Sequence, residues 1–402
     1  MRQCSFFDLS CRLIAIVLLA FLSSAPSCTP STRQPQPSPS PSPTPSPSPT
    51  PPPSPSAEVF TADDGTRFSV EVVITNLEVA WSLTFSPDGR LFVTERPGRV
   101  RIVQFGQLLA QPALVLADTA SLGESGVLGL TLHPRFTENG LVYLVYTARR
   151  PDSSVVNRLM RFRELNNTLG EPRVLLDNIP AASTHDGSRV RFGPDGKLYM
   201  TMGDASRAAS AQELGSLSGK IYRMNDDGTT PADNPFGSLL YSYGHRNPQG
   251  LDFHPVTGDL WESEHGNIGH DEINRIERGG NYGWPTIEGS QTRAGMVTPA
   301  LFFEPSIPLS GASFYTGSAI PNFRNNFFVA TLGSQHIQRV RLDPVDNRRI
   351  VANERLLAGR YGRLRDITTG PDGFLYFSTS NRDGRGTPAT SDDRILRIVP
   401  AR

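Results

Sequence analysis

Short stretches of alternating apolar and polar residues recur along most of the chain, and a sharp turn opens each of them. The clearest copies are SPDGRLFVTE from Ser86, GPDGKLYMTM from Gly193 and GPDGFLYFST from Gly370. Pro-Asp-Gly predicts a tight turn, and the alternation after it predicts a strand with one face on a core. Three weaker copies of the same pattern begin at His133, His254 and Ile320. The pattern therefore predicts six units, each made of a turn and a strand.

A second strand pattern follows most of the copies, as in GRVRIV, GKIYRMN and DRILRIV, and the unit recurs at intervals of roughly 45–65 residues. Strands at this period, with almost no amphipathic helix between them, are typical of a β-propeller. A sandwich would hardly repeat one signature six times, and a β-helix has a much shorter period. We therefore predict an all-β fold for residues 57–402, a six-bladed β-propeller of four-stranded antiparallel blades.

The turn residues themselves are expected to be structural. Asp88, Asp195 and Asp372 belong to the Pro-Asp-Gly turns, and His133 and His254 each precede a proline. The loops between strands differ, because a propeller gathers its functional loops around one mouth of the central channel. Polar residues far apart in the sequence can meet at that mouth.

The N-terminal segment has the pattern of an export signal. Arg2 and Arg12 flank an apolar run from Leu13 to Leu22, which has the length of a signal-peptide core and is too short to span a bilayer. We expect a signal peptide at residues 1–28, of lipoprotein type, with Cys28 as the lipidated residue that anchors the chain to a membrane. Plain secretion and an uncleaved anchor are the alternatives.

Composition narrows the organisation and the chemistry further. Residues 29–56 are nearly pure Pro, Ser and Thr, which favours a disordered, extended linker. The three cysteines, Cys4, Cys11 and Cys28, lie in or at the edge of the processed region, so the domain has no disulfide, thiol or cysteine–metal chemistry. With 39 basic and 39 acidic residues the formal net charge is zero, and no nucleic-acid partner is indicated. We predict an exported protein of the periplasm or the cell surface.

Charged residues and glycines are concentrated between Tyr243 and Pro285. Glycines let the backbone approach a bound group, and polar loops on a rigid scaffold commonly carry binding and catalysis. The motifs GHRNPQG, SEHG, DEIN and GGNYGWP occur there. In order and spacing they closely resemble the signature of the soluble sugar dehydrogenases that use pyrroloquinoline quinone (PQQ), the glucose/sorbosone dehydrogenase family. The resemblance extends from about Leu77 to the C-terminus.

The resemblance implies a PQQ site. His185, in STHDGSRVRFGPDG, matches the family's general base, and neutral imidazole near pH 7 suits removal of a sugar hydroxyl proton. Arg246 and Asn247 match the pair beside the reactive carbonyls of the cofactor, where both can stabilise negative charge and Arg246 would be catalytic. Arg363 and Arg365 match two arginines that grip the cofactor's carboxylates.

Glu124, in LGESGVLGLTLHP, matches a polar residue that lines the same pocket and would contact cofactor or substrate. Taken from the residues alone, other roles stay open. His185 could be structural, Arg246 could tie two blades together, and Glu124 could be an ordinary loop residue. Arg363 and Arg365 could be an exposed pair at a blade edge.

Calcium is the second cofactor that the resemblance implies. Backbone carbonyls at Gly266 and Asn267 would hold the ion that polarises the quinone, although Asn267 replaces a frequent proline. Glu272 and Tyr282, the latter through its carbonyl, match a second calcium site, with Asp271 as a supporting candidate.

One residue departs from the pattern of the soluble glucose dehydrogenases. They carry a lysine that contacts the cofactor after the strand equivalent to FFVATL, and this chain has Gly333 there. The loss of a cation against a tri-acid would weaken binding unless another basic residue substitutes. The change fits the broader aldose dehydrogenase branch of the family.

The resemblance implies a quinoprotein that oxidises aldose sugars at the anomeric carbon to lactones and passes electrons to an external acceptor. The GxGxxG fingerprint of nicotinamide binding, between a strand and a helix, does not occur. Two alternatives remain. A non-catalytic extracellular binding propeller would be expected to lack these site residues. A calcium-dependent lactonase or esterase would centre its metal on carboxylate and asparagine side chains.

Overall fold

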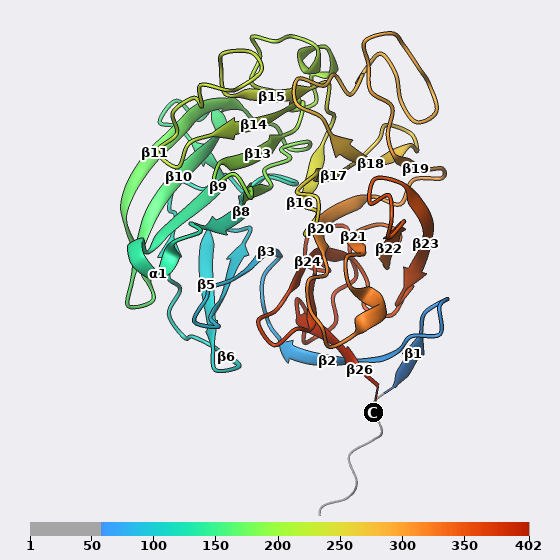
Figure 1. The fold of residues 1–402 in the computed structure, drawn as a ribbon. Coiled ribbons are helices and arrows are strands. Elements are labelled where there is room, and N and C mark those ends of the chain that lie inside the picture. The colour runs from blue at the N-terminus through green and yellow to red at the C-terminus, as the bar shows by residue number, and fades with distance from the viewer. Residues whose placement is uncertain (1–57, 402) are drawn as a thin grey trace, which may run out of the picture. The chain divides into compact units, whose positions relative to one another are not determined.

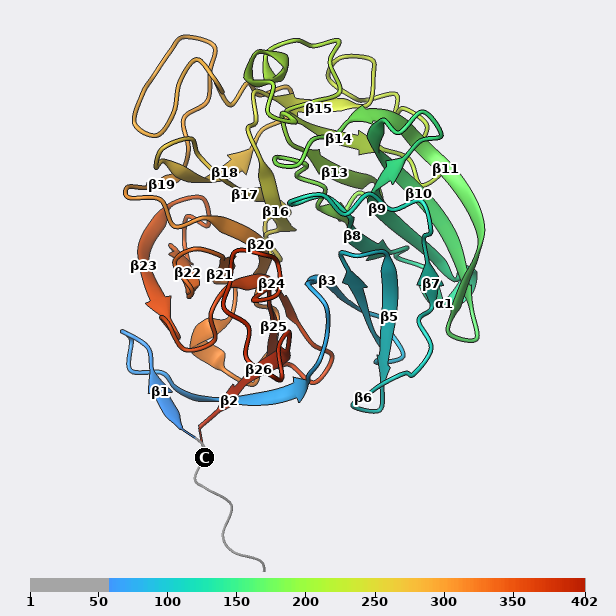
Figure 2. The same ribbon diagram turned by 180° about the vertical axis from the view of Figure 1, so that it is seen from behind.

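The computed structural model describes residues 58–401, which form six antiparallel sheets and very little helix (Figures 1 and 2). The expected signal peptide, with Cys28, and the linker at 29–56 lie outside the described residues, so these domain boundaries stay predictions. Within the described range, no helix has the length and apolar character needed to cross a membrane.

Each sheet is one blade of a six-bladed β-propeller, so the predicted fold class is confirmed. The innermost strands contact one another in turn and close a ring around the channel. They are β3 (Ala80–Phe85), β8 (Val127–Leu132), β12 (Val190–Phe192), β16 (Pro248–Phe253), β20 (Leu309–Phe314) and β24 (Leu364–Thr369).

The other strands of each blade follow outward in antiparallel order. The second strands are β4 (Leu91–Glu95), β9 (Leu141–Arg149), β13 (Leu198–Met202), β17 (Leu260–Glu264), β21 (Phe327–Thr331) and β25 (Leu375–Thr379). The third strands are β5 (Arg99–Gln104), β10 (Val155–Leu165), β14 (Lys220–Met224), β18 (Asp271–Ile276), β22 (Ile337–Leu342) and β26 (Ile395–Pro400). The outer strands are β6 (Gln107–Leu108), β7 (Leu114–Val115), β11 (Thr168–Pro180), β15 (Leu240–Tyr243), β19 (Leu301–Phe303), β23 (Ile350–Leu356), β2 (Arg67–Ile74) and β1 (Val59–Thr61). The short helices are α1 (Phe136–Asn139), η1 (Ala208–Ala211) and η2 (Pro321–Phe323).

The six predicted turns join the first and second strands of the six blades. In the Pro-Asp-Gly turns the aspartate closes the turn: Asp195 Oδ1 accepts the N–H of Lys197 at 3.0 Å. The following Gly196 has a φ of +71°, a left-handed conformation that glycine adopts without strain. His133 Nδ1 likewise accepts the N–H of Arg135 at 3.0 Å. The structural roles predicted for the turn residues are confirmed.

The last blade contains both ends of the described chain. N-terminal β2 pairs with C-terminal β26, with Phe68 opposite Pro400 and Val70 opposite Ile398. Figure 1 shows β2 beside β26 at one edge of the ring. This pairing closes the propeller through main-chain hydrogen bonds between residues more than 300 positions apart.

The hydrophobic core lies between the blades. Each of six buried clusters joins residues of two adjacent sheets, as where Phe92 and Ile102 of one blade meet Val142 and Leu144 of the next. Because both faces of each sheet are covered, many strands are buried along their whole length, including β4, β8 and β13. The rigid stack of sheets fixes where the connecting loops begin and end.

Candidate active site

The channel has two chemically different ends. At one end the innermost strands begin and the second strands finish, and we call this the strand-start mouth. At the other end lie the turns between first and second strands, and we call this the turn mouth. The predicted site residues belong to segments at the strand-start mouth: Glu124, His185, Arg246, Asn247, Gly266, Asn267, Arg363 and Arg365.

His185 is held by a buried carboxylate. It lies in the loop that leads into β12, its side chain is 19% exposed, and its Nδ1 is 2.8 Å from Asp204 Oδ1. Asp204 is 1% exposed, and its second oxygen accepts a hydrogen bond from Trp284 Nε1 at 2.8 Å. When Nδ1–H donates to Asp204, Nε2 carries the free lone pair. The geometry therefore presents His185 as a hydrogen-bond acceptor or base.

Arg246 and Asn247 lie next to this histidine. The backbone carbonyl of Arg246 accepts the N–H of Asp204 at 2.8 Å, and Asn247 Oδ1 accepts the N–H of Gly187 at 3.1 Å. The Arg246 guanidinium lies 5.2 Å from the centre of the Trp284 ring and donates from Nη1 to the His265 carbonyl at 3.3 Å. Stacking and hydrogen bonding fix the position of this cation.

Two more cations come from the last blade, formed by β24, β25, β26, β2 and β1, which we call the closing blade. Arg363 Nε and Arg365 Nη2 both approach Asp383 Oδ2, at 2.8 and 3.3 Å. Arg365 also donates to Gln249 at 3.0 Å, and burial lowers its pKa to about 10. The two arginines are buried, so the structure does not place them as an exposed pair at a blade edge.

Glu124 connects these groups to the histidine. Its Oε2 accepts the backbone N–H of His185 at 3.2 Å, and its Oε1 pairs with Arg385 at 2.8 Å. Arg385 follows Asp383 in the same loop and donates its backbone N–H to that carboxylate at 2.9 Å. The structure therefore brings the predicted side chains of the PQQ site together around one mouth.

The polar groups here fit an anion with several acceptors. Among residues 58–401, four buried side-chain nitrogen atoms at this mouth have no hydrogen-bond partner: the donors Arg96 Nε, Arg246 Nε and Asn247 Nδ2, and His265 Nε2. A buried polar atom without a hydrogen-bond partner costs folding free energy, so a cluster of such atoms is typical of a ligand-binding site. The chemistry of this donor set suits a planar ligand with carboxylates and carbonyls, as PQQ is.

The predicted calcium ligands also offer suitable oxygens. In the hydrogen bonds recorded for the described chain, neither the Gly266 nor the Asn267 carbonyl is an acceptor. Asp271 anchors this loop, because its Oδ1 accepts the Gly266 N–H at 2.9 Å and its Oδ2 accepts the Ser306 hydroxyl. Asp271 is therefore engaged in supporting the loop, and the carbonyls remain available for a hard cation.

Glu272 and Tyr282 line a cavity of about 10 Å³, room for roughly one water or ion. Glu264, which follows Glu262 on β17, lines the same cavity and lies opposite Glu272 in the sheet. Burial, together with the nearby Glu264 charge, raises the pKa of Glu272 to about 8. Buried carboxylates that lie opposite each other in a sheet favour a bound cation that offsets their repulsion.

A neighbouring cluster of three buried side chains could also bind a cation. The ligand atoms of His245, Glu262 and Glu264 lie within 4.8 Å of one another, and all three residues are buried. Burial and the Glu264 charge raise the pKa of Glu262 well above its ordinary value. Oxygen-rich surroundings therefore extend from the predicted second calcium site into the blade.

Gly333 comes two residues after the end of β21, which is the place that Asp204 takes after β13, whereas His265 follows β17 directly. The two lysines of the sequence, Lys197 and Lys220, do not substitute for the missing one. Lys197 belongs to a turn at the turn mouth, and Lys220 is fully buried and donates to three backbone carbonyls. A cation that compensates for the missing lysine at the strand-start mouth must therefore be an arginine or a histidine.

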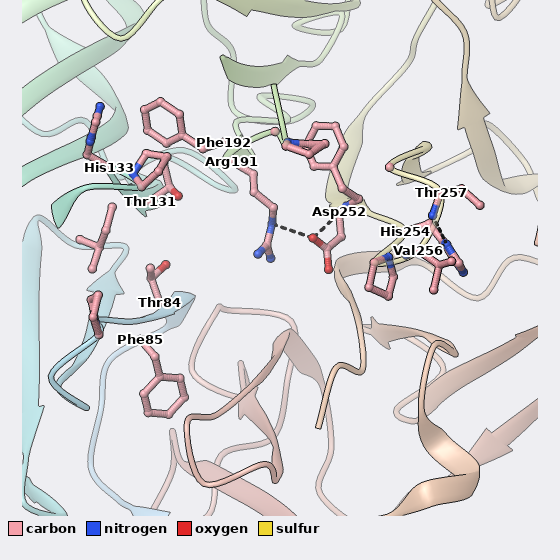
Figure 3. Close-up of a pocket in the computed structure, with 18 residues that line it drawn as sticks. Thr84, Phe85, Thr131, His133, Arg191, Phe192, Asp252, His254, Val256 and Thr257 are labelled. Carbon is pink, nitrogen blue, oxygen red and sulfur yellow. Dashed lines mark hydrogen bonds and ion pairs between the residues drawn. The ribbon is translucent and has the colours of Figure 1, made fainter. Parts of the chain in front are cut away.

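The turn mouth holds a cavity of about 780 Å³ that contains none of the predicted site residues (Figure 3). Arg191 and Asp252 form an ion pair there at 3.3 Å, with the ring of Phe192 nearby. The histidines that line this cavity, His133 and His254, accept hydrogen bonds from their own turns. The candidate chemistry is at the opposite mouth.

Asp204, Asp383 and Trp284 contact the predicted site residues, although no motif of the sequence singled them out. Asp204 and Arg96 come directly or almost directly after second strands, as Gly333 does. The repeat therefore carried a signal that could have found Asp204 and Arg96, because polar residues that follow each second strand reach the same mouth.

The chain is similar to known proteins in sequence and in fold. The family model described as Glucose / Sorbosone dehydrogenase matches residues 77–396. The chain is 31% identical over 341 residues to the aldose sugar dehydrogenase YliI of Escherichia coli, covering 79% of this chain and 91% of the relative. It is 34% identical over 271 residues to quinoprotein glucose dehydrogenase B of Acinetobacter calcoaceticus, covering 59% and 56%. The solved PQQ-bound aldose sugar dehydrogenase from Streptomyces coelicolor matches with a TM-score of 0.75 and 33% identity, covering 83% of this chain and 98% of the other.

Proposed function

The chain belongs to the glucose/sorbosone dehydrogenase family, and we propose that it is a PQQ-dependent enzyme that oxidises aldose sugars at the anomeric carbon to lactones. The observation that carries the proposal is the set of unpaired donors and arginines around the strand-start mouth. Such a set suits a planar ligand with three carboxylates and leaves a base beside it.

The chain's own residues divide the work of binding. Arg363 and Arg365 would hold carboxylates of the cofactor, while Arg246 and Asn247 would donate to oxygens on which negative charge develops. Glu124 would line the pocket and keep the His185 loop in place through its hydrogen bond to the backbone. When bound, PQQ would accept the hydride and pass electrons to an external acceptor, and calcium would polarise its carbonyls.

His185 would remove the proton from the anomeric hydroxyl of the sugar. Its Nδ1 is committed to Asp204, so Nε2 is the acceptor, and the carboxylate would stabilise the imidazolium that forms. Asp204 itself is buried and both of its carboxylate oxygens are engaged, by His185 and by Trp284, so its role would be to position His185.

Gly266 and Asn267 would hold calcium through their carbonyls, and Glu272 with the Tyr282 carbonyl would hold a second ion. Both sets are oxygen donors, which calcium prefers. The proposed setting is the periplasm or the cell surface, with Cys28 as a lipid anchor. The mass of the N-terminal peptide of the mature protein tests this. An unmodified Cys28, or a chain that still begins at residue 1, would rule out the lipid anchor.

The test is reconstitution of the protein with PQQ and calcium, followed by dye reduction with a panel of aldoses. We expect reduction that requires quinone and calcium, disappears with a chelator, and falls at least about 100-fold in His185→Ala, as loss of a general base does. His133→Asn at the turn mouth is the matched control and should retain full activity. Quinone-independent hydrolysis of a lactone would favour the lactonase instead, and bound quinone with no sugar oxidation would favour the binding propeller.

A further inference from the structure

Arg96 is a buried arginine that the proposed chemistry has not used. It follows β4 directly, is 9% exposed, and lies at the strand-start mouth. Its Nη2 makes one long hydrogen bond, 3.4 Å, to the backbone carbonyl of Asp383. Among residues 58–401, its Nε has no hydrogen-bond partner.

The other buried arginines of the described chain all have carboxylate partners. Arg189 pairs with Asp366 at 3.1 Å, and the remaining buried arginines are paired at 3.3 Å or less: Arg223, Arg339, Arg363 and Arg365. No ion pair of Arg96 occurs within residues 58–401. A buried charge normally needs a partner, so this exception calls for a physical reason.

The surroundings of Arg96 hold more positive than negative charge. Asp383, whose backbone carbonyl accepts from Arg96, already pairs through its side chain with Arg363 and Arg365, and Glu124 is paired with Arg385. Burial lowers the pKa of Arg96, the charges of Asp383 and Glu124 raise it, and the positive charges of Arg385 and Arg363 lower it again. The cluster therefore lacks an anion.

The backbone holds the side chain of Arg96 in place. Gly126 packs so closely that a Cβ on it would lie 2.5 Å from Arg96 Cγ and 2.2 Å from the Arg96 carbonyl oxygen. The N–H of Val127 donates to that same carbonyl at 2.9 Å. The backbone and the Cγ of Arg96 are thus held before any ligand binds, which reduces the entropy lost on binding.

We propose that Arg96 binds a carboxylate of the anionic cofactor and supplies the positive charge that is missing at Gly333. With Arg363 and Arg365 it would complete a set of three guanidinium groups for a tri-acid. This inference rests on the proposed function, because it names one more residue for the same ligand.

The test is the dissociation constant of PQQ, titrated with calcium into the apoprotein by calorimetry. We expect Arg96→Gln to weaken binding about 10- to 100-fold, the loss of one charge-assisted hydrogen bond, and Arg96→Lys to recover part of it. Arg191→Gln is the control, since it removes one positive charge from the same channel at the turn mouth. It should change the affinity less than about threefold.

A second measurement separates binding from structure. The apo form of Arg96→Gln should keep or raise its melting temperature, because an unpaired buried cation is removed. Equal PQQ affinity in wild type and Arg96→Gln would overturn the inference, and so would a clear loss of apo stability in that variant. Benzene-1,3,5-tricarboxylate serves as a second probe. If only this tri-acid binds, and does so through Arg96, the anion site stands and the quinone function falls; if neither probe binds, both fall.

Discussion

At the residue scale, the candidate base is held by contacts from several blades. His185 has a φ of +65°, an uncommon conformation for a residue with a side chain. Its backbone N–H donates to Glu124 and its ring to Asp204, while Trp284 fixes the far oxygen of that carboxylate. Strained backbone held by many contacts is frequent at functional sites, where it keeps a group ready for reaction.

The first prediction concerns Asp204. Asp204→Asn replaces the carboxylate that accepts from His185 Nδ1 with a neutral amide. The imidazole then loses its fixed orientation and the negative charge that stabilises its protonated form. We expect kcat for aldose oxidation to fall at least about 100-fold while the Kd for PQQ changes little. Stopped-flow kinetics and a binding titration measure the two effects. An unchanged kcat would show that Asp204 has no part in positioning the base.

The second prediction concerns pH. Burial raises the pKa of Asp186 from 3.8 to about 6. Between these values the unfolded chain ionises while the folded protein keeps the proton, so folding stability falls as pH rises from about 4 to about 6. The contribution is about 3 kcal/mol, present below pH 4 and lost above pH 6. Asp186→Asn should remove this slope, which melting curves at several pH values would show; parallel curves for both proteins would contradict the assignment.

At the element scale, the ends of strands decide which residues meet. Loops that enter first strands and residues that follow second strands reach the strand-start mouth, which is how His185 and Asp204 come together although they are 19 positions apart. The closing blade adds Arg363 and Arg365 to the same mouth. The closing blade includes β2, which comes from the N-terminal end of the described chain and pairs with β26.

The third prediction tests that closure. Phe68 of β2 is 1% exposed and packs against Phe323 at 5.8 Å between ring centres. Phe68→Ala should cost about 3–5 kcal/mol of unfolding free energy, because it leaves a cavity in the core of the closing blade. Phe105→Ala, on a ring that is 95% exposed, is the control and should be nearly neutral. Urea unfolding compares them, and equal midpoints would mean that β2 contributes little.

The sequence predicted the six turns and their strands because Pro-Asp-Gly and alternation are local signals. It did not predict the pairing of β2 with β26, since no local pattern links strands at opposite ends of the chain. Arg246 and Asn247 could be named because they lie within a motif. Asp204 and Arg96 lie in no such motif, and only a comparison of the residues that follow each second strand could have found them. The counterparts of buried side chains, such as Asp383 for Arg363, depend on packing that spacing does not reveal.

At the scale of the whole molecule, one arginine ties the ring together inside the channel. Arg189 precedes β12 and donates to the Gln249 carbonyl of β16, to Ser82 of β3 and to Asp366 of β24. It also lies 4.3 Å from the Trp81 ring. Four of the six innermost strands therefore share a single buried cation.

The fourth prediction follows from this role. Arg189→Met should cost about 3–5 kcal/mol, because it leaves Asp366 buried without its partner. Adding Asp366→Asn should restore part of that loss, since the uncompensated charge is removed and the acceptor for the Leu83 N–H remains. Chemical unfolding of the single and double variants decides: a double variant no more stable than Arg189→Met would contradict the pairing.

We propose that the strand-start mouth holds PQQ and that His185 takes the sugar proton. A single turnover without an electron acceptor tests both directly, with the PQQ- and calcium-loaded protein mixed anaerobically with an aldose. We expect the quinone absorbance to be lost in one phase, more slowly with sugar deuterated at the anomeric carbon, and at least about 100-fold more slowly in His185→Ala. Tightly bound quinone that no aldose reduces, or reduction at the same rate in His185→Ala, would contradict it.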